Sequence, residues 1–346
     1  MNKRIPRRQT LLLVSILLLC SLLDWGLIGA LPLLGLSYGP VWPGVFLFGI
    51  VRILLLLITA LVLKMPLSRV GRLLTVVATV LFQVGVFALA YDSFYIEPFR
   101  LTVTRLPIHA PAFLPGRDLR ILQISDLHVE RITQREQEVL VQAESLQPDI
   151  IVLTGDYINA SYLDDPLSLQ ETRQILSQFH APYGVFAVNG NTDNPYFMLS
   201  LFQGIKNIQV LNDEVFPLQL PGGILYLVGE TYRVGSNLNT LPNLLASLPP
   251  HAYSILLYHT SDLIRTVASK GVDLYLSGHT HGGQFRLPFY GAIFTGAYYG
   301  KKYEMGKYTL GPTTLYVSRG LGMAGGLLPR ARFLCPPELV LVELGK

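Results

Sequence analysis

The chain has 346 residues, of which half belong to the hydrophobic set and only 14% are charged. This balance is too apolar for an ordinary soluble domain, and it favours a chain with membrane-spanning segments. The formal net charge of +4 is mild, and it gives no reason to expect a nucleic-acid partner.

Three apolar runs in the first hundred residues predict membrane-spanning helices, at about residues 10–31, 43–63 and 71–92. Each run reaches the ~20 apolar residues that cross a hydrocarbon core. A cleaved signal peptide is the alternative for the first run, but that run continues past Asp24 and two more runs follow it. We therefore expect residues 1–95 to form a transmembrane anchor of three helices.

The basic residues that flank these runs predict the orientation of the chain. The N-terminal tail contains Lys3, Arg4, Arg7 and Arg8, and the second connection contains Lys64, Arg69 and Arg72. The first connection has no basic residue. Because Lys and Arg collect on the cytoplasmic side of a membrane, the tail and the second connection are expected in the cytoplasm. Three crossings then leave everything after Tyr91 on the far side.

Two ionisable residues, Asp24 and Arg52, fall inside the predicted spans. Unpaired, each would cost about 2.5–3.5 kcal/mol in the middle of a membrane helix. A mutual ion pair with a structural role is the simplest interpretation. The two cysteines, Cys20 in the first span and Cys335 near the C-terminus, predict no disulfide framework.

A proline-rich stretch over residues 96–118 predicts an extended linker, and from Leu119 strands alternate with helices. This order predicts an α/β domain over residues 119–346. Strands are expected at 119–125, 149–155, 184–190, 224–230, 253–259, 272–278, 313–320 and 338–344, and helices at 132–147 and 168–180.

Polar side chains follow five of these predicted strands: Asp126, His128, Asp156, Asn191, Asp193, His259, His279 and His281. In open α/β sheets, ligands collect outside the carboxyl ends of the strands. Carboxylate, amide oxygen and imidazole suit dications such as Mn²⁺, Zn²⁺ or Fe²⁺. Asp193 is not counted as a ligand, and the remaining residues are too many for one metal ion. They suffice for two ions if one carboxylate binds both. The lone histidines His109, His180 and His251 are expected to lie outside the site.

The blocks "SDLH", "GD", "GNTD", "H" and "GHTH", in this order over about Leu119 to Leu344, resemble the calcineurin-like metallophosphoesterase family. The apolar N-terminal runs and the tail "VSRGLG…LPRARFLCPPELVLVEL" are similar to its bacterial, membrane-associated branch. That branch includes enzymes similar to the UDP-2,3-diacylglucosamine pyrophosphatases of lipid A synthesis. The resemblance implies a β-sandwich flanked by helices and a location in the inner (cytoplasmic) membrane.

The resemblance also implies two divalent metal ions and assigns their ligands. One ion would take Asp126, His128, Asp156 and His281, and the other would take Asp156, Asn191, His259 and His279. A hydroxide shared by the ions would attack phosphorus in a phosphodiester or pyrophosphate bond. Catalysis would then depend on Asp156, Asn191, Asp193 and His279.

The sequence departs from the family pattern Gly-Asn-His-Asp at Thr192, where the histidine normally supplies a proton to the leaving oxygen. Threonine is no acid at neutral pH, and loss of a general acid costs ~10²–10⁴-fold in rate. The cost is smallest for leaving groups that are stable anions, which favours a pyrophosphate or an aryl ester. Asp193 is expected to be the hydrogen-bonding partner of Asn191.

The remaining motifs bear on the substrate. "GLGMAG", from Gly320 to Gly325, has no helix after it and is interpreted as a loop and not as a dinucleotide site. The aromatic and basic stretch after "HGGQ", which includes Lys301 and Lys302, suits a membrane interface and hence a lipid-linked phosphate. The alternatives are the lipid A pyrophosphatase itself, or a membrane protein that binds metal or lipid with weakened catalysis. The oligomeric state is left open.

Overall fold

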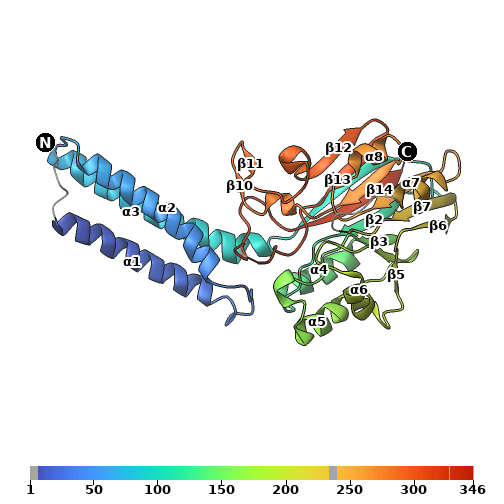
Figure 1. Ribbon diagram of the computed structural model, residues 1–346, viewed down its shortest axis with the longest axis horizontal. Coiled ribbons are helices and arrows are strands. Elements are labelled where there is room, and N and C mark those ends of the chain that lie inside the picture. Colours follow the sequence, from blue (N-terminus) through green and yellow to red (C-terminus); the bar gives the residue numbers. More distant parts are fainter. Residues whose placement is uncertain (1–6, 234–239, 327, 346) are drawn as a thin grey trace. The chain divides into compact units, whose positions relative to one another are not determined.

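The computed structural model describes residues 7–233, 240–326 and 328–345, and it divides the chain into two compact units (Figure 1). The first unit comprises Met1–Ile96 together with Leu327–Ala331, and the second comprises Glu97–Gly326 together with Arg332–Lys346.

The first unit is built from three apolar helices. They are α1 (Arg7–Gly29), α2 (Trp42–Leu63) and α3 (Arg69–Tyr91), and a π-helical turn, η1 (Asp92–Ile96), continues α3. In the described part of the chain, two helical segments are long and apolar enough to cross a membrane, Trp42–Leu63 and Arg69–Phe99. In α1 the qualifying apolar segment is shorter, Leu13–Gly29. Helices thus form at all three predicted positions, whereas the number of membrane spans stays a prediction.

A buried polar cluster joins these helices. Arg52 donates from Nε and Nη2 to the two carboxylate oxygens of Asp24, at 2.8 and 2.7 Å, and from Nη1 to Gln83 Oε1 at 2.8 Å. The three side chains come from α2, α1 and α3 and are all buried. The ion pair predicted from the sequence is therefore present, and a bidentate contact of this kind fixes how the helices pack.

The second unit contains two six-stranded mixed sheets. The first has the order β1-β14-β2-β3-β4-β5, with the bounds Thr102–His109, Glu338–Gly345, Leu119–Ile124, Ile150–Leu153, Val185–Ala187 and Ile208–Val210. The second has the order β12-β13-β9-β8-β7-β6, with the bounds Gly306–Leu310, Thr313–Val317, Leu274–Ser277, Ser254–Leu257, Gly223–Gly229 and Glu214–Leu220. A short hairpin, β10 (Arg286–Leu287) and β11 (Gly291–Ala292), lies outside both sheets.

The two sheets form a sandwich that helices cover on its outer faces (Figure 1). Side chains from both sheets make one central core. On the first sheet a second core forms with α4 (Gln134–Ser145), α5 (Pro166–Leu176) and α6 (Pro195–Phe202). On the second sheet a third core forms with α7 (Leu241–Ala246) and α8 (Ile264–Ala268). Short 3₁₀ turns complete the unit: η2 (Glu97–Phe99), η3 (Ala160–Tyr162), η4 (His281–Gly283) and η5 (Gly300–Tyr303). This is the α/β arrangement with flanking helices that the sequence predicts.

The stretch expected to be a linker is partly a strand of the first sheet. β1 pairs in parallel with β14, with Leu106 opposite Val342 and Pro107 opposite Glu343. The prolines of this stretch indicated an extended chain, and an extended chain can also be an edge strand. Because β1 has a neighbour on one side only, the missing N–H of Pro107 removes no hydrogen bond that an inner strand would need.

Candidate metal centre

The loops after β2, β3, β4, β8 and β9 carry all the candidate ligands, and several of these residues have an unusual backbone. Positive φ angles between 43° and 71° occur at Asp126, His128, Asp156, His279 and His281. In residues with a side chain this conformation costs about 1–3 kcal/mol each and persists only where the surroundings impose it. Such strain collects at functional sites, and here it falls on residues chosen from the sequence as ligands.

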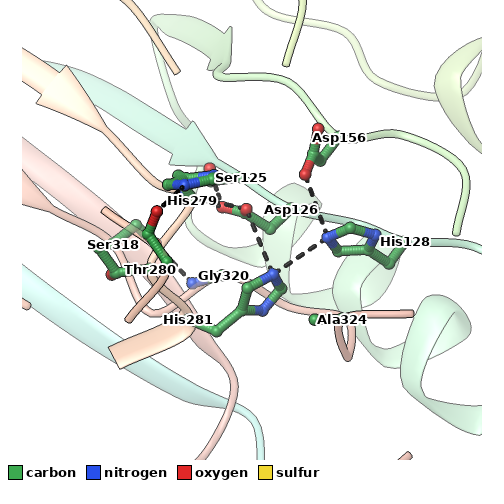
Figure 2. A network of polar contacts seen from close by, with 12 residues as sticks. Ser125, Asp126, His128, Asp156, His279, Thr280, His281, Ser318, Gly320 and Ala324 are labelled. Atoms are coloured by element: carbon green, nitrogen blue, oxygen red, sulfur yellow. Dashed lines mark hydrogen bonds and ion pairs between the residues drawn. The ribbon is translucent and has the colours of Figure 1, made fainter. Parts of the chain in front are cut away.

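The first group of ligands comprises Asp126, His128 and His281, all of them buried. The Nε2 atoms of His128 and His281 lie 3.0 Å apart, and His281 Nε2 lies 3.5 Å from Asp126 Oδ1 (Figure 2). The backbone N–H of His279 donates to the Asp126 carboxylate at 3.0 and 3.1 Å. Three donor atoms thus converge on one point, and the loop that carries two of the histidines also holds the carboxylate.

The second group comprises Asp156, His259 and His279, to which Asn191 adds its amide oxygen. Asn191 Oδ1 lies 2.9 Å from His259 Nε2 and 2.7 Å from His279 Nδ1. His259 is fully buried, whereas Asn191 is exposed and His279 is partly exposed. This group therefore forms the open side of the site, and the first group forms its closed side.

Asp156 stands between the two groups. Its Oδ2 atom lies 3.4 Å from His128 Nε2 and 3.4 Å from His259 Nε2. Its other oxygen, Oδ1, accepts hydrogen bonds from the backbone N–H and the hydroxyl of Thr192, both at 2.9 Å. One oxygen is held by the protein, and the other faces both groups, as a bridging ligand requires.

The hydrogen bonds around the histidines leave suitable nitrogen atoms facing inward. His259 Nδ1 lies 2.7 Å from the carbonyl oxygen of Thr154, so this nitrogen carries the hydrogen and Nε2 is free to bind a metal. His279 Nε2 lies 3.4 Å from the carbonyl oxygen of Gly296, which leaves Nδ1 toward Asn191. These outer partners orient the rings as they do in metal-binding histidines generally.

The electrostatics of the site favour a cation. Burial by itself raises the pKa of the Asp156 carboxyl, but the facing His259 and His128 outweigh burial and hold that pKa well below its usual value. Burial lowers the pKa of His259, yet the Asp156 carboxylate outweighs it and raises that pKa to about 10. Burial, with His128 and Arg332 nearby, holds the pKa of His281 well below its usual value. The negative potential that raises the pKa of His259 attracts cations in general, and a bound dication would take the place of the proton on Nε2.

Asp193, in the loop after β4, contacts other atoms than the sequence suggested. Asp193 was expected to bind Asn191, but its carboxylate accepts hydrogen bonds from the backbone N–H groups of Asp156 at 2.6 Å, Gly190 at 2.9 Å and Tyr157 at 3.2 Å. A carboxylate is the natural acceptor where several N–H groups converge, and here two of them, from Asp156 and Tyr157, belong to the Asp156 loop. Burial, followed by the charge of Asp156, raises the pKa of Asp193 to about 7.

The loop "GLGMAG", interpreted from the sequence only as a loop, packs directly on the first group. A Cβ atom on Gly320 would lie 2.6 Å from Asp126 Cβ, so no larger residue can stand there. The fully buried Arg332 donates to the carbonyl oxygens of Gly320 and Gly322, at 3.1 and 2.5 Å from Nη2, and fixes the loop. The run of glycines was the available signal, but sequence alone gives no partner for it.

The other histidines lie elsewhere: none of His109, His180 and His251 belongs to either group in the described part of the chain. A cavity of about 810 Å³ lies next to the loop that carries Asn191. Asn189 and Thr231 border it, and most of its wall is apolar, with Met198, Leu199, Phe202, Val210 and Leu211 among the lining residues.

Known proteins match the region that contains this site. The family model for calcineurin-like phosphoesterases matches residues 119–283. The uncharacterized metallophosphoesterase YkuE of Bacillus subtilis is 33% identical over 72% of this chain and 87% of the relative. Phosphodiesterase YaeI of Escherichia coli is 29% identical over 72% of this chain and 90% of its own length.

A third relative carries a named activity. UDP-2,3-diacylglucosamine pyrophosphatase LpxG of Chlamydia trachomatis is 28% identical over 72% of this chain and 91% of its own length. Among solved structures, TT1561 of Thermus thermophilus is 14% identical, covers 59% of this chain and 90% of its own, and has a TM-score of 0.41. On the family match and its relatives, the chain belongs to the calcineurin-like metallophosphoesterases and is a hydrolase of that family.

Proposed function

We propose that this chain is a membrane-anchored phosphoesterase that uses two divalent metal ions to hydrolyse a phosphodiester or pyrophosphate bond in a lipid-linked or nucleotide-sugar substrate. The observation that carries the proposal is the position of Asp156, whose Oδ2 atom lies 3.4 Å from a histidine of each ligand group. A carboxylate between two sets of donors is what a pair of ions needs to share a ligand.

The residues fit this cofactor. Asp126, His128, Asp156 and His281 would hold one ion, and Asp156, Asn191, His259 and His279 would hold the other. Mn²⁺, Zn²⁺ and Fe²⁺ suit this mixture of carboxylate, amide and imidazole. When bound, the two ions supply a nucleophile at neutral pH and neutralise charge that develops on the phosphoryl oxygens.

The protein's own residues orient this machinery. Thr192 holds Oδ1 of Asp156, and Asp193 holds the backbone of the same residue, so both keep the shared carboxylate in place. The carbonyl of Thr154 fixes the ring of His259. Substrate would enter from the open side, where Asn191 and His279 are accessible.

The substrate class follows from what surrounds this opening. Thr192 stands where the family has an acid, and its hydroxyl is engaged with Asp156, so a leaving group that needs no proton is favoured. The apolar cavity beside the Asn191 loop supports a substrate with a lipid portion. The pyrophosphatase activity named for LpxG supports a pyrophosphate bond.

The anchor is proposed to consist of three membrane-spanning helices in residues 1–95, with the catalytic domain of residues 119–346 outside the cytoplasm at the inner membrane. The linker proposed for residues 96–118 shrinks to the residues on either side of β1 (Thr102–His109). A reporter fused after Lys346 is expected to be active only outside the cytoplasm. Activity of a cytoplasmic reporter at that point would contradict the orientation.

Two alternatives have observations in their favour. The match to LpxG favours UDP-2,3-diacylglucosamine pyrophosphatase activity. The nucleotide substrate of that activity is cytoplasmic, so this alternative requires the catalytic domain to face the cytoplasm, opposite to the orientation proposed above. Thr192 favours a metal- or lipid-binding protein with weakened catalysis.

The test is the full chain in detergent with Mn²⁺, assayed on nucleotide pyrophosphates, lipid pyrophosphates, phospholipids and aryl phosphates, beside an Asp156→Ala control. Turnover of anhydride or aryl substrates that the control lacks supports the enzyme. Equal rates in both proteins would favour the binding protein, and a clear preference for UDP-2,3-diacylglucosamine would favour the first alternative.

A further inference from the structure

Apolar side chains gather on the β10–β11 hairpin and the loop that follows it. The exposed ones are Leu287, Phe289, Tyr290, Ile293, Phe294 and Tyr298, and they define the aromatic surface. Single exposed apolar residues such as Val141 on α4 and Leu167 on α5 are common on soluble domains and need no explanation. Six exposed apolar side chains within one short segment, in contrast, are typical of a contact surface.

Phe289, in the turn between β10 and β11, is the most telling member of the surface. Its side chain is fully exposed, and its φ angle is +64°. A turn in water with this backbone favours Gly or Asn, which adopt positive φ at little cost. An aromatic residue is unfavourable here both for the backbone and for hydration, so neither the turn nor solubility accounts for its presence.

The hairpin is held firmly to the domain. Arg286 donates to Glu304 Oε1 at 2.7 Å and to the carbonyl oxygen of Gly282 at 2.7 Å. The other carboxylate oxygen of Glu304 accepts from the backbone N–H of Ala292, on the second strand, at 3.1 Å. The Glu304 carboxylate thus bonds to both strands of the hairpin. The aromatic side chains are therefore held in position before they contact a partner.

Basic groups accompany the aromatic rings. Lys301 Nζ lies 3.2 Å from the centroid of the Tyr290 ring and donates to the Tyr290 carbonyl oxygen. Lys302 follows it in η5, with its ammonium 5.4 Å from the centroid of the Tyr303 ring. Aromatic rings with adjacent lysines are the composition found where proteins meet phospholipid headgroups.

The surface adjoins the candidate metal centre. The hairpin begins shortly after His281, and the carbonyl oxygen of Gly296, in the loop after β11, lies 3.4 Å from His279 Nε2. His279 belongs to the open side of the site. A membrane or protein that binds the aromatic surface would therefore lie next to the open side of the metal centre, where substrate enters.

We propose that the aromatic surface docks on a phospholipid bilayer that contains anionic lipids, so that headgroup phosphates come to the open side of the metal centre. The occupant is a bilayer because the same chain carries helices long and apolar enough to cross one, and because lysines among aromatics complement anionic headgroups. The docking itself is independent of catalysis, while its purpose rests on the proposed function.

Site-directed nitroxide labelling of the full chain tests the docking. The chain is placed in vesicles of phosphatidylcholine and phosphatidylglycerol with Cys20→Ala, while the buried Cys335 stays unlabelled. Labels at Phe289→Cys and Phe294→Cys should be reached by oxygen and protected from a water-soluble nickel complex. Labels at the control sites Val141→Cys and Leu167→Cys should be reached by the nickel complex. Nickel access at 289 and 294 equal to that at the controls would overturn the proposal, and so would protection from both reagents, which indicates a protein contact.

Rates on two substrates test the purpose of docking. In Phe289→Ser/Phe294→Ser, the rate of hydrolysis of a soluble aryl phosphodiester should stay unchanged. The rate on a lipid that carries an aryl phosphodiester and resides in the vesicles should fall about tenfold, through a higher KM. Val141→Ser/Leu167→Ser should change neither rate. Equal losses on both substrates would overturn this role. If the native chain hydrolyses neither, the proposed function fails, and the nitroxide labels still decide the docking.

Discussion

A single methyl group added at Gly278 should empty one half of the metal centre. In Gly278→Ala the new Cβ atom would lie 2.1 Å from Asp126 Oδ2 and 1.9 Å from Ser125 Oγ. Ordinary contact begins near 3.4 Å, so Oδ2 has to retreat by about 1.3 Å. The carboxylate is rigid, so Oδ1, the oxygen that faces His281, has to move with it. Metal ligands tolerate displacements of about 0.2 Å. The backbone of Gly278 itself has no positive φ, so the effect comes from the methyl group alone.

The expected result is selective loss of the ion held by Asp126, His128 and His281. Metal analysis after dialysis should fall from about two ions per chain to about one, and turnover should fall at least about 100-fold. Gly229→Ala is the matched control, because its methyl group would lie 2.2 Å from Leu211 Cβ, in the core and away from both groups. The control should lose thermal stability while keeping its metal content. A Gly278→Ala protein with two ions and native turnover would refute the assignment of Asp126.

Further predictions concern the shared carboxylate, its hydroxyl partner and the buried ion pair. Asp156→Ala should lose both ions together with activity. If metal analysis of this variant finds the full metal content, the bridging role of Asp156 is ruled out. Thr192→Val removes the hydrogen bond from the Thr192 hydroxyl to Asp156 but keeps the one from the backbone N–H, so metal affinity should fall about tenfold and return in Thr192→Ser. Thr192→His should raise the rate of hydrolysis of alkyl esters relative to aryl esters. Equal effects on the two kinds of ester would exclude a role of position 192 in leaving-group chemistry. Asp24→Asn leaves Arg52 buried with a neutral partner and should destabilise the helical unit in detergent by about 3 kcal/mol, whereas Asp24→Leu/Arg52→Leu should cost less; a costlier double variant would contradict the pairing.

The ligand positions could be predicted from the sequence because each stands at the end of a recognisable strand. Asp126 and Asp156 follow adjacent parallel strands of the first sheet, and His259 follows a strand that is parallel to β9 in the second sheet. The carboxyl ends of parallel strands lie at the same edge of a sheet, which places these side chains in two groups, one from each sheet. The spacing of His279 and His281 also carried information, since the two rings contact different ligand groups. Strand ends and motif order are local features, and local features survive in a sequence.

The hydrogen-bonding partners could not be predicted, because they depend on loops that are distant in sequence. Thr192 was judged only by the histidine it replaces, whereas its hydroxyl and N–H both hold Asp156, 36 positions away. Asp193 contacts the backbone of the same loop and not Asn191. The prolines in and around β1 indicate an extended chain but no neighbour, which favours a linker, and the actual neighbour, β14, is at the other end of the domain.

The requirement on the leaving group and the aromatic surface together narrow the range of substrate classes. With the Thr192 hydroxyl engaged at Asp156, position 192 offers no acid to protonate an alkoxide, so a simple phospholipid ester would be a poor substrate. The aromatic surface beside His279, in contrast, supports a substrate that resides in a bilayer. A lipid-linked pyrophosphate meets both requirements, because its hydrolysis expels a phosphate that is already stable as an anion. On these grounds lipid pyrophosphates are the class on which the enzyme is expected to turn over fastest, ahead of phospholipids with the same acyl chains.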